Sequence, residues 1–305
     1  MTTTLMSQDK YIHAGKIYDS SSGKYHLNKT IIISGNIISS IEDGFIEPKN
    51  EKILIYDLKS KVILPGLIDF HVHMESESGG KDRYINRFQD NKADVAFKST
   101  LVAKKTLLAG FTTVRDVGGS GVNISLRNAI NNGVVIGPRI FTSGKTIATT
   151  GGHGDPTNGY KEGLIDDPGP KDGVVNSISD ARKAVRYRYK NGADLIKITA
   201  TGGVMSMAKN GQNPQFTEEV INAVVSTAKD YGMHVAAHAH GDEGMYRAVK
   251  SGVKTIEHGS IMKERTMKLM REKNAYLVPT ISAGEHVAKM ARIPGYYPEI
   301  IIPKA

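Results

Sequence analysis

From Leu67 onward, short apolar segments alternate with longer segments that have helical periodicity. We expect strands at residues 67–73, 112–117, 139–143, 194–200, 234–240, 255–258 and 276–280, and helices at 94–109, 180–190, 218–231, 243–250 and 263–273. The residues expected to end or cap these helices are Gly110, Gly192, Gly232, Gly252, Thr217 and Ser179. Repeated strand–helix units with nearly continuous apolar strands predict a parallel sheet, and this many units predict a (β/α)-barrel.

The pattern before Pro65 is different. Residues 1–64 carry short β-rich runs separated by Gly, Ser and Asn turns, which predicts a small antiparallel β unit. Pro65-Gly66 marks the change, so we expect domains at 1–64 and 65–305. Because seven barrel strands can be assigned and a closed barrel needs eight, we expect an incomplete barrel. Its open edge would favour association, including homo-oligomers.

Composition narrows the class of protein. The chain has 305 residues and no Cys, which excludes disulfides, thiolate nucleophiles and thiolate metal ligands. The net charge of +9 comes from scattered Lys and Arg, so we expect no nucleic-acid partner. Its local cluster, residues 181–192, reads as an amphipathic helix with Ala184 and Val185 inward and Arg186 and Lys190 in solvent. With no signal peptide or membrane-length apolar run, we expect a cytoplasmic protein.

The first expected barrel strand ends in "FHVH". His71 and His73 are two positions apart, so both side chains can point inward from one strand face and reach a single ion. Lys197 lies in the middle of the strand "ADLIKITATGG" and should be buried, which is costly for an unpaired ammonium. Either an inward carboxylate such as Asp69 pairs with it, or it is a neutral amine that reacts with carbon dioxide to give a metal-bridging carbamate.

Two later strands also end in histidine. "MHVAAHAHG" places His238 and His240 near its carboxyl end, and "TIEHGS" contributes His258. A single inward His is commonly a hydrogen-bonded core residue, but chance explains poorly why three strand ends carry one. Imidazole with carboxylate-type ligands suits zinc, and also manganese or iron.

Further residues are candidates for substrate contacts. His153 lies in the Gly-rich loop "TTGGHGD" on the same barrel face, where a surface histidine is the alternative. Tyr246 follows the fifth expected strand and either lines the pocket or packs in the core. No phosphate loop, nucleophile elbow or dinucleotide fingerprint is present in the sequence.

The motifs taken together resemble the amidohydrolase superfamily, in its imidazolonepropionase-like and Xaa-Pro dipeptidase (prolidase-like) branch. They are "PGLIDFHVHM", "TTVRDVGG", "TTGGHGD", "ADLIKITATGG", "AAHAHG" and "TIEHGS". The resemblance implies a TIM-type (β/α)8 metal-dependent hydrolase barrel with a β-sandwich unit. It implies two divalent metal ions with ligands at His71, His73, His238 and His258, and a carboxylated Lys197 between them. His153 and Tyr246 match substrate contacts, and His240 is the alternative to His238.

The implied chemistry is hydrolysis of a dipeptide-like amide by a hydroxide that bridges the two ions. In the family, an Asp at the end of strand eight completes one metal site and carries the proton to the leaving amine; no residue of this chain can be assigned to it. Losing a general acid/base costs about 10²–10⁴ in rate, so a truncated chain would be impaired. The same metal core also supports a lactonase, an organophosphate hydrolase or a deaminase. An inactive fragment that needs a partner chain is the remaining alternative.

Overall fold

The computed structural model describes residues 9–77, 82–207 and 209–305. The chain divides into two compact units, Met1–Leu67 and Ile68–Ala305. The sequence placed this boundary between residues 64 and 65. None of the helices in the described ranges is both long enough and apolar enough to cross a bilayer.

The first unit is a four-stranded sheet with the order β3-β2-β1-β4. Its strands are β1 (Lys10–Asp19), β2 (Lys24–Ser34), β3 (Ile37–Asp43) and β4 (Leu54–Ile63). The pairs β1–β2 and β2–β3 are antiparallel as expected, whereas β4 runs parallel to β1. A Cβ on Gly15 would lie 1.8 Å from the carbonyl oxygen of Lys59, so only glycine fits the bulge where these two strands meet. The described residues of this unit form one layer.

The second unit alternates strands and helices. Its strands are β5 (Leu67–Val72), β6 (Phe111–Asp116), β7 (Arg139–Thr142), β8 (Ile196–Thr199), β9 (Val235–Gly241), β10 (Thr255–Ile261) and β11 (Tyr276–Val278). Its helices are α1 (Asp82–Gln89), α2 (Lys92–Leu108), α3 (Val122–Asn131), α4 (Ile178–Lys190), α5 (Glu218–Asp230), α6 (Asp242–Lys250), α7 (Glu264–Glu272), α8 (Ile281–Ala291) and the 3₁₀ turn η1 (Ile302–Lys304). All seven expected barrel strands and all five expected helices are confirmed.

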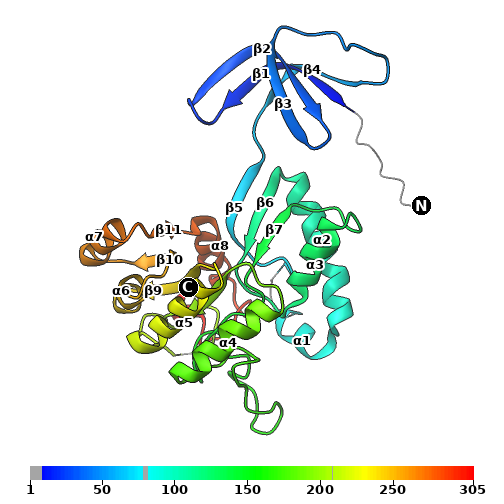
Figure 1. The fold of residues 1–305 in the computed structure, drawn as a ribbon. Coiled ribbons are helices and arrows are strands. Elements are labelled where there is room, and N and C mark those ends of the chain that lie inside the picture. The colour runs from blue at the N-terminus through cyan, green and yellow to red at the C-terminus, as the bar shows by residue number, and fades with distance from the viewer. Residues whose placement is uncertain (1–8, 78–81, 208) are drawn as a thin grey trace. The chain divides into compact units, whose positions relative to one another are not determined.

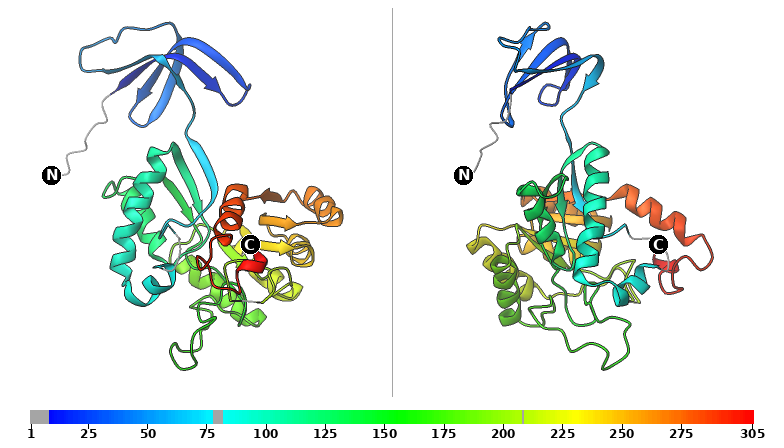
Figure 2. Two further views of the ribbon diagram at one scale, coloured as in Figure 1. Left: turned by 180° about the vertical axis from the view of Figure 1, so that it is seen from behind. Right: turned by 90° about the vertical axis from the view of Figure 1, so that its right-hand side faces the viewer.

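The seven strands follow one another in space in chain order. They form two sheets, β5-β6-β7 and β8-β9-β10-β11. Beside β7, Asp194 N donates to Thr142 O at 2.7 Å, and after β7 Ile147 pairs with β8, its N–H donating to Lys197 O at 2.8 Å and its carbonyl accepting from Thr199 N at 3.0 Å. Helices α2 and α3 accompany β6 and β7, and α5 and α6 lie against the second sheet (Figures 1 and 2). This is the expected α/β fold of barrel type.

The core explains which strand residues face inward. The largest cluster of buried side chains lies between the second sheet and its helices, and includes Ile196, Ile198, Ala237 and Ile256. Because strand side chains alternate, the other face of β8 and β10 carries Lys197, Thr255 and Glu257 toward the barrel interior. The interior next to the histidines is therefore polar and charged.

Most of the helix ends lie at the residues predicted from the sequence. Gly110, Gly192, Gly232 and Gly252 all have a positive φ, as glycine permits at the end of a helix. Thr217 is the N-cap of α5 as expected. The expectation for α4 was wrong: Ser177, not Ser179, is its N-cap, and the Ser177 hydroxyl accepts from Asp180 N at 3.1 Å.

Candidate metal centre

His71 and His73 lie at the carboxyl end of β5, with ring centroids 5.3 Å apart. The Nδ1 of His71 donates to Glu257 Oε2 at 2.8 Å, and the Nδ1 of His73 donates to Gly118 O at 2.7 Å. A carboxylate and a carbonyl can only accept, so these contacts place the ring proton on Nδ1. The lone pair of each ring is therefore on Nε2.

His238, His240 and His258 form the second group. Each offers one nitrogen such that the three lie within 4.8 Å of one another. His238 donates through Nε2 to Gly202 O at 3.0 Å, which leaves its lone pair on Nδ1. The Nδ1 atoms of His240 and His258 contact the hydroxyls of Ser260 and Thr280, at 2.9 and 2.7 Å.

The two groups are in contact. The ring of His258 lies 4.8 Å from that of His71 and 4.7 Å from that of His238, measured between centroids. The structure thus brings together all five histidines that the sequence assigned to the strand ends. Their parallel strands end at one face of the barrel, where such folds carry their sites.

Burial favours the neutral form of three of these histidines, His71, His238 and His258. Burial is the main cause that holds the pKa of His71 and of His238 well below 6.5, and it lowers that of His258 to about 2. The neighbouring Lys197 and the other histidines lower these pKa values further. Neutral imidazole is the form that binds metals.

Lys197 lies among them. Its side chain is 4% exposed, and burial lowers its pKa from 10.5 to about 8, against the opposing effect of Glu257. Among the described residues it forms no ion pair within 4.0 Å. The expected alternative partner, Asp69, instead accepts from the backbone N of His71 at 2.9 Å. In the part of the chain that the structure describes, Glu257 and Asp116 act on the amine only from beyond ion-pair distance.

Two charged residues near the site were not anticipated from the sequence. Arg115 on β6 and Glu257 on β10 form an ion pair of 2.6 Å inside the barrel. Arg115 is 6% exposed and Glu257 is 0% exposed. The sequence could have indicated Arg115 and Glu257 in the same way as Lys197, because each is a charged residue at an inward position of an apolar strand.

Asp116 organises the loops behind His73. Its carboxylate accepts from Met74 N at 2.9 Å, Gly118 N at 3.2 Å and Asn123 Nδ2 at 2.9 Å. Burial raises the pKa of Asp116 to about 6, although these donors oppose the change. Gly118 then presents its carbonyl to His73, so Asp116 holds the acceptor that orients this histidine.

Of the two residues expected to contact substrate, His153 lies against the histidines and Tyr246 does not. His153 stacks on His238 with a centroid distance of 4.2 Å, so the loop after β7 reaches the cluster. Tyr246 lies on α6 with Arg265 over its ring at 4.7 Å, and no described contact joins it to the histidines. Its role as a substrate contact stays a prediction.

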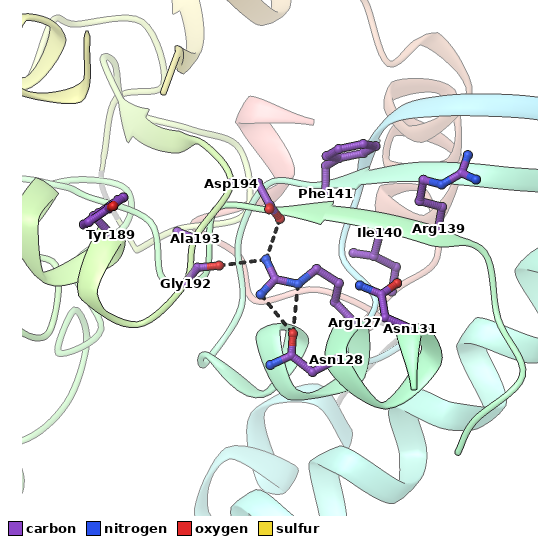
Figure 3. A pocket seen from close by; sticks show the side chains of 10 residues that line it. All are labelled: Arg127, Asn128, Asn131, Arg139, Ile140, Phe141, Tyr189, Gly192, Ala193 and Asp194. Atoms are coloured by element: carbon purple, nitrogen blue, oxygen red, sulfur yellow. Dashed lines mark hydrogen bonds and ion pairs between the residues drawn. The ribbon is translucent and has the colours of Figure 1, made fainter. Parts of the chain in front are cut away.

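A hollow of about 450 Å³ lies at the other end of the strands (Figure 3). It is lined by α3, by the amino-terminal end of β7, by Tyr189 of α4 and by residues 192–194, which precede β8. Arg127 crosses it and donates to Asp194 and to the Gly192 carbonyl, each at 2.7 Å. The amino-terminal face of such barrels serves stability rather than chemistry, which distinguishes this hollow from the face that carries the histidines.

Comparison with known proteins identifies the family. The model of the amidohydrolase family matches residues 62–303. The chain belongs to this family. Ochratoxinase from Aspergillus niger is 32% identical to this amidohydrolase over 291 residues, which cover 90% of the chain and 59% of the relative. The chain thus spans less than two thirds of that relative's length.

Solved structures agree with the family. A Xaa-Pro dipeptidase with methionine bound in its active site has a TM-score of 0.93 at 53% identity, over 97% of this chain and 73% of that one. A prolidase complexed with N-methylphosphonate-L-proline has a TM-score of 0.86 at 33% identity, over 97% and 72%. The crystal structure of the A. niger ochratoxinase has a TM-score of 0.81 at 28% identity, over 96% and 69%. The fold and the prolidase-like branch expected from the sequence are confirmed.

Proposed function

We propose that this amidohydrolase hydrolyses the amide bond of a dipeptide-like substrate with two divalent metal ions, zinc by preference. The observation that carries the proposal is the gathering of five histidines from β5, β9 and β10, in which neighbouring ring centroids lie 4.7–5.3 Å apart. The likeness to a Xaa-Pro dipeptidase at 53% identity supports the substrate class.

The donor set fits such ions. His71 and His73 keep their lone pairs on Nε2, and His238 keeps its lone pair on Nδ1, because the opposite nitrogen of each ring donates to an oxygen. Histidine ligands of metals characteristically donate their second N–H in this way. We assign His71 and His73 to one ion and His238 and His258 to the other.

Lys197 would bridge the two ions as a carbamate. A pKa of about 8 leaves a fraction of the amine neutral at neutral pH. The neutral nitrogen attacks the carbon of carbon dioxide and loses a proton, which gives an anionic carbamate with two oxygen donors. This modification also accounts for a buried lysine that forms no ion pair with any described residue.

The chain's own residues would bind and orient the substrate. A bound zinc ion lowers the pKa of water to about 7 and polarises a carbonyl, which is the chemistry amide hydrolysis needs. His153 stacks on His238 at the edge of the cluster and presents its ring from the loop after β7. We assign His153, His240 and Tyr246 to substrate contacts.

Metal analysis and a substrate panel test the proposal. The purified protein, incubated with Zn²⁺ and bicarbonate, should bind two ions and carry one carbon dioxide on Lys197, measured by elemental analysis and mass spectrometry. His238→Ala should lower both metal content and hydrolysis of Xaa-Pro dipeptides. The matched control is His286→Ala, because His286 is an exposed histidine on α8.

Two results would contradict the proposal. A protein that binds no Zn²⁺ in the presence of bicarbonate has no metal centre at these residues. A protein that binds zinc and cleaves lactones but no Xaa-Pro, Xaa-Arg or Xaa-Lys dipeptide has a different substrate class.

A further inference from the structure

One buried side chain contacts the first group of histidines and is next to a member of the second group in the sequence. Glu257 accepts from His71 Nδ1 through Oε2, and it directly precedes His258 on β10. The same carboxylate therefore fixes the ring of a histidine on β5 and belongs to the strand that carries a histidine of the other group.

Arg115 holds this carboxylate in place. Its Nη2 donates to Glu257 Oε1 at 2.6 Å and its Nη1 donates to Thr255 Oγ1 at 3.0 Å. The Thr255 hydroxyl donates a hydrogen bond to the same Oε1 at 2.6 Å. The Nε of Arg115 donates to Phe70 O at 2.7 Å, which is the carbonyl directly before His71. One network thus ties β5, β6 and β10 across the barrel interior.

Stability alone does not account for this network. Removing an ion from water costs several kcal/mol, and replacing a buried ion pair by apolar side chains is often neutral or stabilising. Arg115 and Glu257 are both almost fully buried. This ion pair also contacts the ring of His71 and the carbonyl before it. Orientation of His71 therefore explains the pair better than stability does.

We propose that Glu257 is a positioning residue that fixes the tautomer of His71 and couples the geometry of the two metal sites, with Arg115 fixing Glu257. The inference rests on the proposed metal centre and goes beyond it by naming the residue that orients its ligands. Oε2 accepts only, so the proton of His71 stays on Nδ1 and Nε2 keeps its lone pair for an ion.

The substitution Glu257→Gln should reverse the tautomer of His71. Arg115 only donates and the Thr255 hydroxyl also donates at Oε1, so the amide oxygen must take that place. The amide NH₂ then faces His71 Nδ1. Two donors cannot share this contact, so the His71 proton moves to Nε2 and occupies the position an ion needs. The size of the side chain hardly changes.

Zinc affinity and the tautomer of His71 are the two readouts. We expect Glu257→Gln to bind zinc 10–100-fold more weakly at the site of His71, the usual cost of losing such a partner. Competition with a chromophoric chelator measures the affinity. The ¹⁵N–¹H spectrum of ring-labelled histidine in the metal-free protein should show Nδ1–H in the wild type and Nε2–H in the variant. The signal is assigned by its loss in His71→Asn.

Thr255→Val is the matched control. It removes a hydroxyl from the network but leaves the contact between Glu257 and His71, so the Nδ1–H tautomer should persist. If both variants lost zinc equally with His71 unchanged, the network would be structural only. Zinc affinity of Glu257→Gln equal to the wild type, or Nε2–H on His71 in the wild type, would also overturn the inference. If the wild type bound no zinc, the proposed function would fail, whereas the tautomer would still decide the role of Glu257.

Discussion

Lys197→Met should stabilise the metal-free protein while removing its metal site. Burial lowers the pKa of Lys197 from 10.5 to about 8, and each pKa unit corresponds to 1.36 kcal/mol. Below pH 8, where the ammonium is charged in both states, burying it therefore costs the folded state about 3 kcal/mol. Met is of similar length and carries no charge. At pH 7, without metal or bicarbonate, we expect the variant to be more stable by about 2–3 kcal/mol.

The sign of the pH dependence follows from the same shift. Between pH 8 and 10.5 the unfolded chain keeps its proton on Lys197 while the folded protein releases it. The unfolded state binds more protons in this window, so the stability of the wild type rises with pH. The advantage of Lys197→Met should therefore shrink between pH 8 and 10.5.

Urea unfolding of chelated, degassed protein at pH 7 and 9.5 measures both effects. Lys190→Met is the control, because Lys190 is exposed on α4. With Zn²⁺ and bicarbonate the order should reverse, since only the wild type gains the free energy of metal binding. A variant less stable than the wild type at pH 7 in the absence of metal would refute the argument, because it would mean that Lys197 is already well compensated.

Two further substitutions test the supports of the site. Asp116→Asn puts an NH₂ group against one of the three donors that meet at this carboxylate, so we expect a loss of about 1–3 kcal/mol in urea unfolding. Arg188, 3% exposed, donates to the carbonyls of Lys145 at 2.7 Å and Lys171 at 3.2 Å, at the two ends of the loop that carries His153. Arg188→Met should raise trypsin cleavage within this loop about tenfold by increasing its open population, whereas the exposed Arg186→Met should not. Unchanged cleavage would show that the loop is held by other contacts.

Local patterns predicted most of the fold. The strands from β5 to β11 were recognised because apolar runs of strand length recur between helical segments, and the glycines after four helices marked their ends. Helix α3 was missed because it begins in a Gly-rich stretch, with Gly121 as a left-handed N-cap at φ 102°. The parallel pairing of β4 with β1 was missed because neither strand's own pattern specifies its partner.

Some residues of the candidate site could be predicted from local sequence patterns, and others could not. The histidines were found because each marks the end of a strand, and strand ends of a barrel meet at one face. The network of Arg115 and Glu257 was missed because it joins residues 142 positions apart whose pairing depends on the three-dimensional arrangement. For the same reason Asp69 was a plausible partner for Lys197, although the structure uses it at the backbone of His71.

The separation of these residues along the chain has a kinetic consequence. His71 and Glu257 are 186 residues apart and meet only when the first and sixth barrel strands have both assembled. Contacts of such long range form late in folding, because closing a long loop must precede them. Ions bound at the two groups of histidines would therefore do little to speed folding. They would act mainly after the native state has formed, by lengthening the time before the barrel opens.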